Sequence, residues 1–203
     1  MAGPGVRAVV GGGDSHHLEQ ELEAIVAGDG QILALLSSGL AGALAPGLQP
    51  GALLIGEEGD PRLISALRRA LPAAKVTRIL GCENAVASVA EKRRLRDESR
   101  AGAVDMESHV VAKVAQRHGI PFAALRVISD AATETLPPAA LCGMRPDGSM
   151  AIGAVLGSIA ANPAQLPALL RTAWNAERGF RALLGCHRSI GLVDLVKHAL
   201  DMP

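Results

Sequence analysis

The chain has 203 residues, of which 49% are hydrophobic and 20% charged, and its 20 Lys+Arg balance its 20 Asp+Glu. A net charge of zero gives no general attraction to nucleic acid or to an anionic membrane, and two Phe, one Trp and no Tyr are too few to stack single-stranded nucleic acid. The length and composition suit one packed domain, which we expect to span residues 1–203.

The cysteines and the apolar segments indicate a protein of a reducing compartment. Cys82, Cys142 and Cys186 are odd in number and widely spaced, unlike a disulfide framework. The apolar run at residues 6–10 is too short for a signal peptide, and the glycine-containing stretch at residues 151–161 falls short of the ~18 residues needed to span a bilayer. We therefore expect a cytoplasmic protein with no transmembrane segment.

Short apolar runs alternate with amphipathic ones along the first part of the chain. The pattern predicts a buried strand at 6–10, a helix at 14–27 with Asp14 as its N-cap, a buried strand at 32–37, a loop of small residues at 38–47 and a short strand at 51–55.

The alternation continues through the rest of the chain. It predicts a helix starting at Pro61, a strand at 75–80, a helix at 91–98, a short extended segment at 103–105, a helix at 106–118, a strand at 122–128 and helices beyond 136–138. The basic run EKRRLR at 91–96 is interpreted as a solvated helix face. This order predicts an α/β domain whose largely parallel sheet is covered by helices on both faces.

Several common functional motifs are missing from the sequence. The GGGD segment at 11–14 follows an apolar run and precedes a helix, but no further glycine completes a dinucleotide-binding fingerprint, and a tight turn is the favoured interpretation. The sequence has neither a P-loop lysine motif nor a G-x-S-x-G elbow, and its histidines do not have metal-ligand spacing. We expect no metal site.

Two carboxylates stand where ligands bind in open α/β sheets. Met106 and Glu107 lie where a strand passes into a helix, and Ser129 and Asp130 follow an apolar strand. The pair could supply a hydrogen-bond acceptor for a sugar and a proton donor for a leaving group. Equally, Glu107 could simply begin a helix and Asp130 occupy a turn. We expect Arg126, inside the apolar strand, to pair with a buried acid such as Asp105.

The segments VDMES (104–108) and LRVISDAA (125–132) resemble the signature of the purine nucleoside phosphorylase and nucleosidase superfamily. The similarity extends to hopanoid-associated phosphorylases through GPGVRAVVGGGD, GLAGALAPGLQPGALL, VASVAEKRRL, AVDMESHVVA and LPPAALCGMRPDG. This resemblance implies a three-layer α/β/α phosphorylase/hydrolase-like fold with a mostly parallel twisted sheet. It also implies that the chain lacks the family's first strand and its glycine-containing loop, so that VRAVV would correspond to the second strand.

The resemblance further implies a role for each matching residue. Glu107 would bind the ribose hydroxyls and Asp130 would protonate the departing purine. The other substrate-binding positions would be Met106, Ser129, Val86, Ala87, Gly39, Leu40, Ala41 and Gly42. Leu40 stands where many relatives carry Ser or Thr, and Val86 stands where an aromatic residue usually stacks on the base.

The leading function implied by the resemblance is phosphorolytic release of adenine from an adenosyl lipid, adenosylhopane, in hopanoid biosynthesis. A hydrolytic nucleosidase acting on methylthioadenosine or S-adenosylhomocysteine is one alternative, and a non-catalytic nucleoside-binding protein is another. No cofactor is implied beyond inorganic phosphate as a co-substrate, and analogy with relatives predicts a homo-oligomer.

Overall fold

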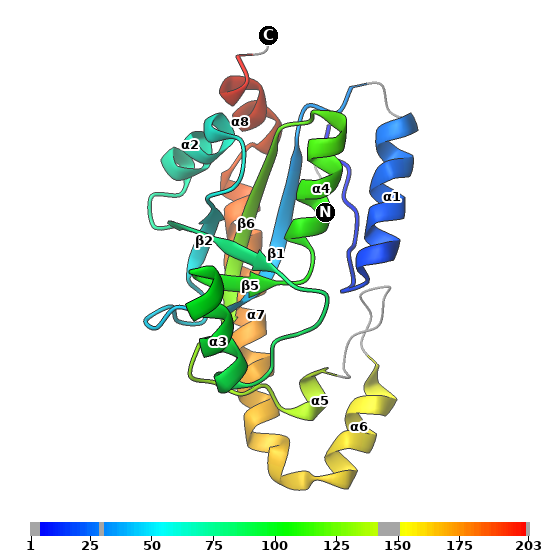
Figure 1. The fold of residues 1–203 in the computed structure, drawn as a ribbon, viewed down its shortest axis with the longest axis vertical. Helices are drawn as coiled ribbons and strands as arrows, with labels where there is room; N and C mark the ends of the chain where they lie inside the picture. The colour runs from blue at the N-terminus through cyan, green and yellow to red at the C-terminus, as the bar shows by residue number, and fades with distance from the viewer. Residues whose placement is uncertain (1–4, 29–30, 142–150, 202–203) are drawn as a thin grey trace.

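The computed structural model describes residues 5–28, 31–141 and 151–201 (Figure 1). Its strands are β1 (Leu35–Ala43), β2 (Leu53–Gly56), β3 (Lys75–Thr77), β4 (Ile79–Gly81), β5 (Ala103–Asp105) and β6 (Phe122–Asp130). Its helices are α1 (Ser15–Gly28), α2 (Pro61–Ala70), α3 (Val89–Ser99), α4 (Ser108–His118), α5 (Pro138–Leu141), α6 (Ile152–Ala161), the 3-10 turn η1 (Pro163–Gln165), α7 (Leu166–Ser189) and α8 (Leu192–Ala199). Cys142 and the end of the LPPAALCGMRPDG block lie outside the described residues.

The six strands form one mixed sheet in the order β3-β2-β6-β1-β5-β4. The parallel pairs are β6 with β1, β2 with β3, and β5 with β4, whereas β2 runs antiparallel to β6 and β5 runs antiparallel to β1. The longest ladder joins β1 to β6 from Leu35↔Phe122 to Gly42↔Asp130, with a register shift between Ala41 and Gly42. The two long parallel strands form the centre of the expected α/β sheet.

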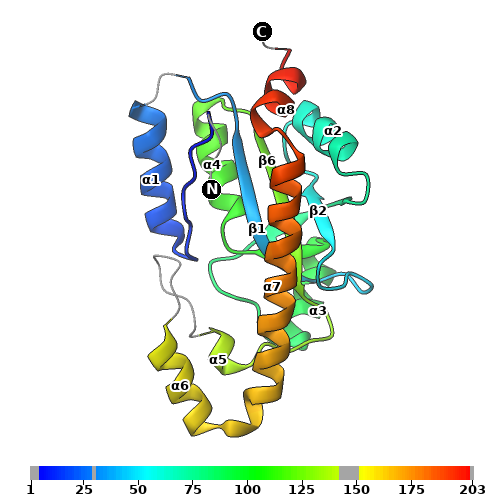
Figure 2. The ribbon, with the colours of Figure 1, turned by 180° about the vertical axis from the view of Figure 1, so that it is seen from behind.

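Helices cover both faces of this sheet, which gives three layers. Helix α4 packs on β1 and β6, and α1 packs outside it (Figure 1). On the opposite face α7 runs along β6 and β1, and α2 and α8 pack together beside it (Figure 2). The three-layer architecture expected from the sequence is confirmed.

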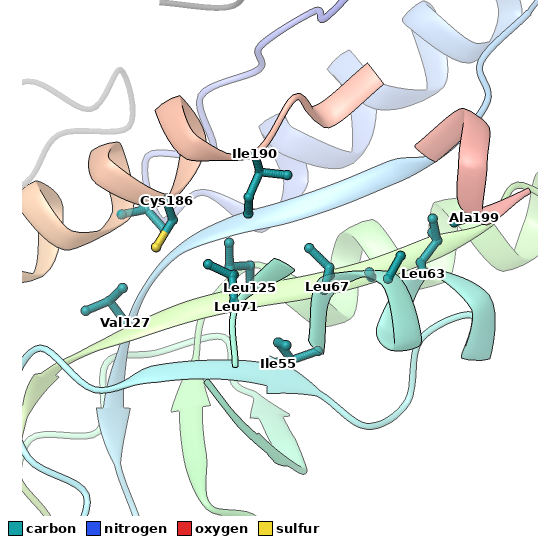
Figure 3. Packing of buried hydrophobic residues seen from close by; sticks show 12 residues of the cluster. Ile55, Leu63, Leu67, Leu71, Leu125, Val127, Cys186, Ile190 and Ala199 are labelled. Carbon is teal, nitrogen blue, oxygen red and sulfur yellow. The ribbon is translucent and has the colours of Figure 1, made fainter. Parts of the chain in front are cut away.

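The main hydrophobic core fills the space between the sheet and the α2, α7 and α8 layer. Figure 3 shows its side chains, which come from β2, β6 and all three helices: Ile55, Leu63, Leu67, Leu71, Leu125, Val127, Cys186, Ile190 and Ala199. Because side chains alternate along a strand, Arg126, which stands between Leu125 and Val127 on β6, projects to the other face. That face carries the polar residues described below.

Local sequence signals set the ends of the helices. Asp14 accepts a hydrogen bond from the backbone N–H of His17 at 2.9 Å, as expected for the start of α1. Asp60 caps α2, and Pro61 lies in its first turn, where a missing N–H costs no helical hydrogen bond. Helix α4 ends at Gly119 with a φ of 65°, a conformation that glycine adopts without steric cost.

The predicted strand at residues 6–10 is wrong. This segment joins none of the described strands, and Arg7, Ala8 and Val10 are exposed. It runs instead as an extended segment beside α1 and α4, where Val9 packs against their shared apolar cluster (Figures 1 and 2). The apolar side chain of Val9 therefore packs against helices α1 and α4, and the segment does not form a covered strand.

Two further boundaries differ from the prediction. Residues 38–43, expected in a loop, form the second half of β1, because small residues there fit a closely packed ladder between β6 and β5. The expected strand at 75–80 is divided at Arg78 into β3 and β4, which pair with different strands. Although only Arg78 separates β3 from β4, the two strands lie at opposite ends of the strand order.

Helix α6 and the first half of α7 project beyond the sheet (Figure 1), and several of their apolar side chains are exposed. The large exposed ones are Ile152, Leu156, Leu166, Leu170 and Trp174. No single helix in the described part of the chain has the length and apolarity to cross a membrane. One pair, Ile152–Ala161 with Pro163–Cys186, satisfies those criteria jointly but is bent by 113°.

Candidate active site

A buried ion pair supports the polar face of β6. Arg126 is fully buried, and its Nε donates to Oδ2 of Asp105 at 2.6 Å. Its Nη2 donates to Oγ of Ser37 on β1 at 2.6 Å, and its Nη1 to the carbonyl of Leu125 at 3.1 Å. Asp105 also accepts bonds from Ser108, from Oγ at 2.6 Å and from the backbone N–H at 3.0 Å. The predicted Arg126–Asp105 pair is confirmed, and it connects β6, β1 and β5.

Glu107 lies between β5 and α4 and faces the loop that precedes α1. It stands at the N-cap position of α4, but its side chain makes no capping hydrogen bond. Instead Oε1 accepts a hydrogen bond from the backbone N–H of Gly13 at 3.4 Å, and a Cβ atom at Gly11 would collide with the carboxylate. The interpretation of Glu107 as only a helix-starting acid therefore does not explain its orientation.

Asp130 ends β6 in a buried ion pair. Its Oδ2 lies 2.5 Å from Nζ of Lys92 on α3, and its Oδ1 lies 2.6 Å from Oγ of Ser129. The register shift that follows Ala41 places Asp130 opposite Gly42, so the irregularity re-aims its side chain. Asp130 is thus not a solvated turn residue.

Strand β1 passes both carboxylates. A Cβ atom at Gly39 would lie 3.8 Å from Oε2 of Glu107, and one at Gly42 would lie 3.1 Å from Oδ2 of Asp130. Glycine at these positions leaves space beside each acid. Gly39 and Gly42 stand three residues apart, roughly 10 Å along the strand, so β1 approaches one acid at each of these two positions.

The other predicted residues have varied surroundings. Met106 is half-buried against the loop before α1, with its Cε atom 3.4 Å from where a Cβ of Gly13 would lie. Val86 is buried in a cluster with Leu44, Ala101 and Val104, and Ala87 accepts a backbone hydrogen bond from Leu136 at 3.0 Å. Ala41 is buried in a second apolar cluster that includes Leu54 and Ile128.

Leu40 projects away from the two acids. It packs into the core beneath α7, where a Cβ atom on Gly179 would come within 3.0 Å of its Cδ2 atom. The side chain of Leu40 is therefore occupied by packing, and its assignment as a substrate-binding position stays a prediction.

Sequence reasoning missed Lys92. The run EKRRLR was interpreted as a solvated face, yet Lys92 is fully buried, whereas its neighbours Arg93 and Arg94 are exposed. No local pattern separates this lysine from the arginines beside it. Its partner, Asp130, lies 38 residues further along the chain.

The described residues offer no alternative catalytic centre of metal or thiol type. No group of three His, Cys, Asp or Glu side chains among them could hold a metal ion. Burial raises the pKa of the Cys82 thiol, and the nearby Asp105 adds to the effect, so this thiol stays protonated at neutral pH. A cavity of about 170 Å³ between β2, β4 and α4 contains none of the predicted site residues.

Residues 56–141 match the model of the Phosphorylase superfamily. This segment contains Lys92, Glu107 and Asp130, whereas β1 with its two glycines precedes it. No curated protein matches the chain in sequence.

Solved nucleosidase structures share the fold. The structure of Helicobacter pylori MTAN is 25% identical to this chain, with a TM-score of 0.53, and the similarity covers 57% of this chain and 65% of that one. A Helicobacter pylori futalosine hydrolase is 26% identical with a TM-score of 0.52, over 57% and 64%. This chain thus covers slightly less than two thirds of both. A 5′-methylthioadenosine/S-adenosylhomocysteine nucleosidase from S. pneumoniae is 17% identical to this chain and has a TM-score of 0.63. The similarity covers 92% of this chain and 78% of that one and shows that the two share a fold.

Proposed function

We propose that this protein cleaves the N-glycosidic bond of a purine nucleoside. The observation that carries the proposal is the placement of Glu107 and Asp130 beside Gly39 and Gly42 of one strand. The match of residues 56–141 to the Phosphorylase superfamily, which includes both acids, supports the same chemistry.

In the proposed reaction the two acids have different tasks. Glu107 accepts hydrogen bonds from the ribose hydroxyls, and Met106 packs against the sugar. Asp130 gives a proton to N7 of the purine while the bond between C1′ and N9 breaks. The O–H bond of Asp130 is lost and an N–H bond forms on the base. A nucleophile then bonds to C1′ of the sugar cation.

The proposed nucleophile is inorganic phosphate, with water as the second candidate. Hydrolysis is favoured by the names of the similar solved structures, a nucleosidase and a futalosine hydrolase. Phosphorolysis is favoured by the sequence resemblance to hopanoid-associated phosphorylases. Neither route needs a cofactor beyond phosphate.

The substrate proposed for the phosphorolytic route is an adenosyl lipid such as adenosylhopane. Val86 and Ala87, which the resemblance assigns to substrate binding, are both aliphatic. Apolar side chains are exposed on α6 and α7, and Arg171 of α7 forms an ion pair with Glu134, which lies four residues after Asp130. The ion pair holds α7, with its exposed apolar side chains, to the segment that follows Asp130. This placement supports a substrate with an apolar tail.

The test is adenine release from adenosine, from 5′-methylthioadenosine and from adenosine carrying a long 5′ alkyl chain, each with and without phosphate. We expect release to require phosphate, to yield a sugar 1-phosphate and to be fastest with the alkyl derivative. Release without phosphate would establish hydrolysis. Binding of all three without release of adenine would establish the non-catalytic alternative.

A further inference from the structure

Lys92 is the single buried residue of α3, a helix whose other side chains are polar, small or only partly covered. A lysine is almost never fully buried unless its charge is paired. An apolar side chain would anchor a helix at lower cost, because desolvating an ammonium ion is expensive. Packing alone therefore does not explain why a lysine stands at position 92.

All three protons of the Lys92 ammonium are directed to acceptors around the end of β6. Nζ donates to Oδ2 of Asp130 at 2.5 Å, to the carbonyl of Ala131 at 2.9 Å and to the carbonyl of Glu134 at 2.7 Å. Because Oδ1 of Asp130 is bonded to Ser129, the carboxylate is held at both oxygens. One side chain thus fixes both the acid and the segment that follows it.

We infer that Lys92 is the positioning residue of Asp130 and stabilises the carboxylate that remains after the proton has moved to the base. The inference rests on the proposed function. In this step the proton leaves Asp130 for N7 of the purine, and the electron pair of the O–H bond stays on Asp130. Lys92 remains protonated, and its charge offsets the anion formed. The contact between Nζ of Lys92 and Oδ2 of Asp130 at 2.5 Å is the arrangement that this inference requires after proton transfer.

A fixed, desolvated charge directed at developing negative charge acts mainly on the transition state. Lys92→Met removes that charge while keeping an unbranched side chain. We expect it to lower kcat by roughly 10²-fold with little change in KM, because Lys92 itself does not touch the substrate. The matched control is Arg93→Met, which removes an exposed charge one residue away and should leave kcat unchanged.

A change of leaving group distinguishes a role of Lys92 in proton donation from a purely structural role. A nucleoside already methylated at N7 departs without needing a proton there. With the 7-methyl derivative of the fastest nucleoside, the loss caused by Lys92→Met should shrink to less than about tenfold, since proton donation no longer limits the step. A lysine that only supports the fold would give equal losses with both substrates, and that result would overturn the inference.

The double variant Lys92→Met/Asp130→Asn keeps the test decisive if the single variant folds poorly, because it leaves no unpaired buried charge. Its kcat should equal that of Asp130→Asn, since residues that act as a unit are not additive. A further loss of tenfold or more would overturn the inference while leaving the proposed function intact. A wild-type chain that releases no base from any nucleoside would refute the proposed function, and this inference with it.

Discussion

Replacing Arg126 with Met should destabilise the fold severely. Arg126 is fully buried and donates to Asp105, to Ser37 and to the carbonyl of Leu125. Removing one partner of such a pair leaves an uncompensated buried carboxylate, at a cost of about 3–5 kcal/mol. A domain of this kind has a total stability of about 5–15 kcal/mol, so the loss is a large fraction of it.

The assay is urea unfolding followed by far-UV circular dichroism, because the one tryptophan, Trp174, is 70% exposed and reports poorly on the core. With a slope of about 2 kcal/mol/M, the midpoint of Arg126→Met should fall by about 2 M. The double variant Arg126→Met/Asp105→Asn should lose only about 1–2 kcal/mol, since it lacks the unpaired charge and loses mainly hydrogen bonds.

The matched control is Arg94→Met, which breaks an exposed i,i+4 pair with Glu98 and should cost no more than about 0.5 kcal/mol. A loss below about 1 kcal/mol in Arg126→Met would refute the assignment of Arg126 as a structural cation. So would a double variant as unstable as the single one, because the cost would then not come from the orphaned acid.

Three further predictions concern the acids. Asp130→Asn should lower kcat by roughly 10²–10⁴-fold, as for a lost general acid, and should also lower the stability because Lys92 loses its counter-ion; an unchanged kcat in the folded variant contradicts the role of Asp130. Glu107→Gln should cost roughly 1.5–3 kcal/mol of transition-state binding in kcat/KM, and much less with a 2′,3′-dideoxy substrate; equal losses contradict the ribose contact. Lys113, together with Arg117, holds the pKa of Glu19 below its usual value of 4.5. This pairing therefore stabilises the fold above that pH and is lost in acid, so Glu19→Gln should flatten the decrease in urea midpoint as the pH falls below 4.5; an unaltered slope contradicts the linkage.

The features that could be predicted from the sequence are those that depend on residues close together in the chain. The long apolar run of β6, the caps at Asp14 and Asp60 and the need of Arg126 for a buried acid all follow from residues near one another or from a charge in an apolar strand. The alternating order of elements was enough to predict the layers.

What it missed depends on contacts distant in the chain. Residues 6–10 have the composition of a buried strand, but a strand needs a neighbouring edge, and they pack beside helices. Residues 38–43 look like a loop because they are small, and only pairing with both β5 and β6 makes them a strand. Lys92 looks like its exposed neighbours until the fold brings Asp130 to it.

Gly42 directly follows the register shift of β1 and pairs with two neighbouring strands. Its backbone is opposite Asp130 on one side and opposite Val104, three residues before Glu107, on the other. At Gly42, strand β1 therefore pairs both with the strand that ends in Asp130 and with the strand that leads to Glu107. Because a Cβ atom at Gly42 would lie 3.1 Å from Oδ2 of Asp130, a side chain there would crowd this carboxylate without replacing either acid. A redesign of the proposed site would therefore begin at Gly42 and leave Glu107 and Asp130 in place.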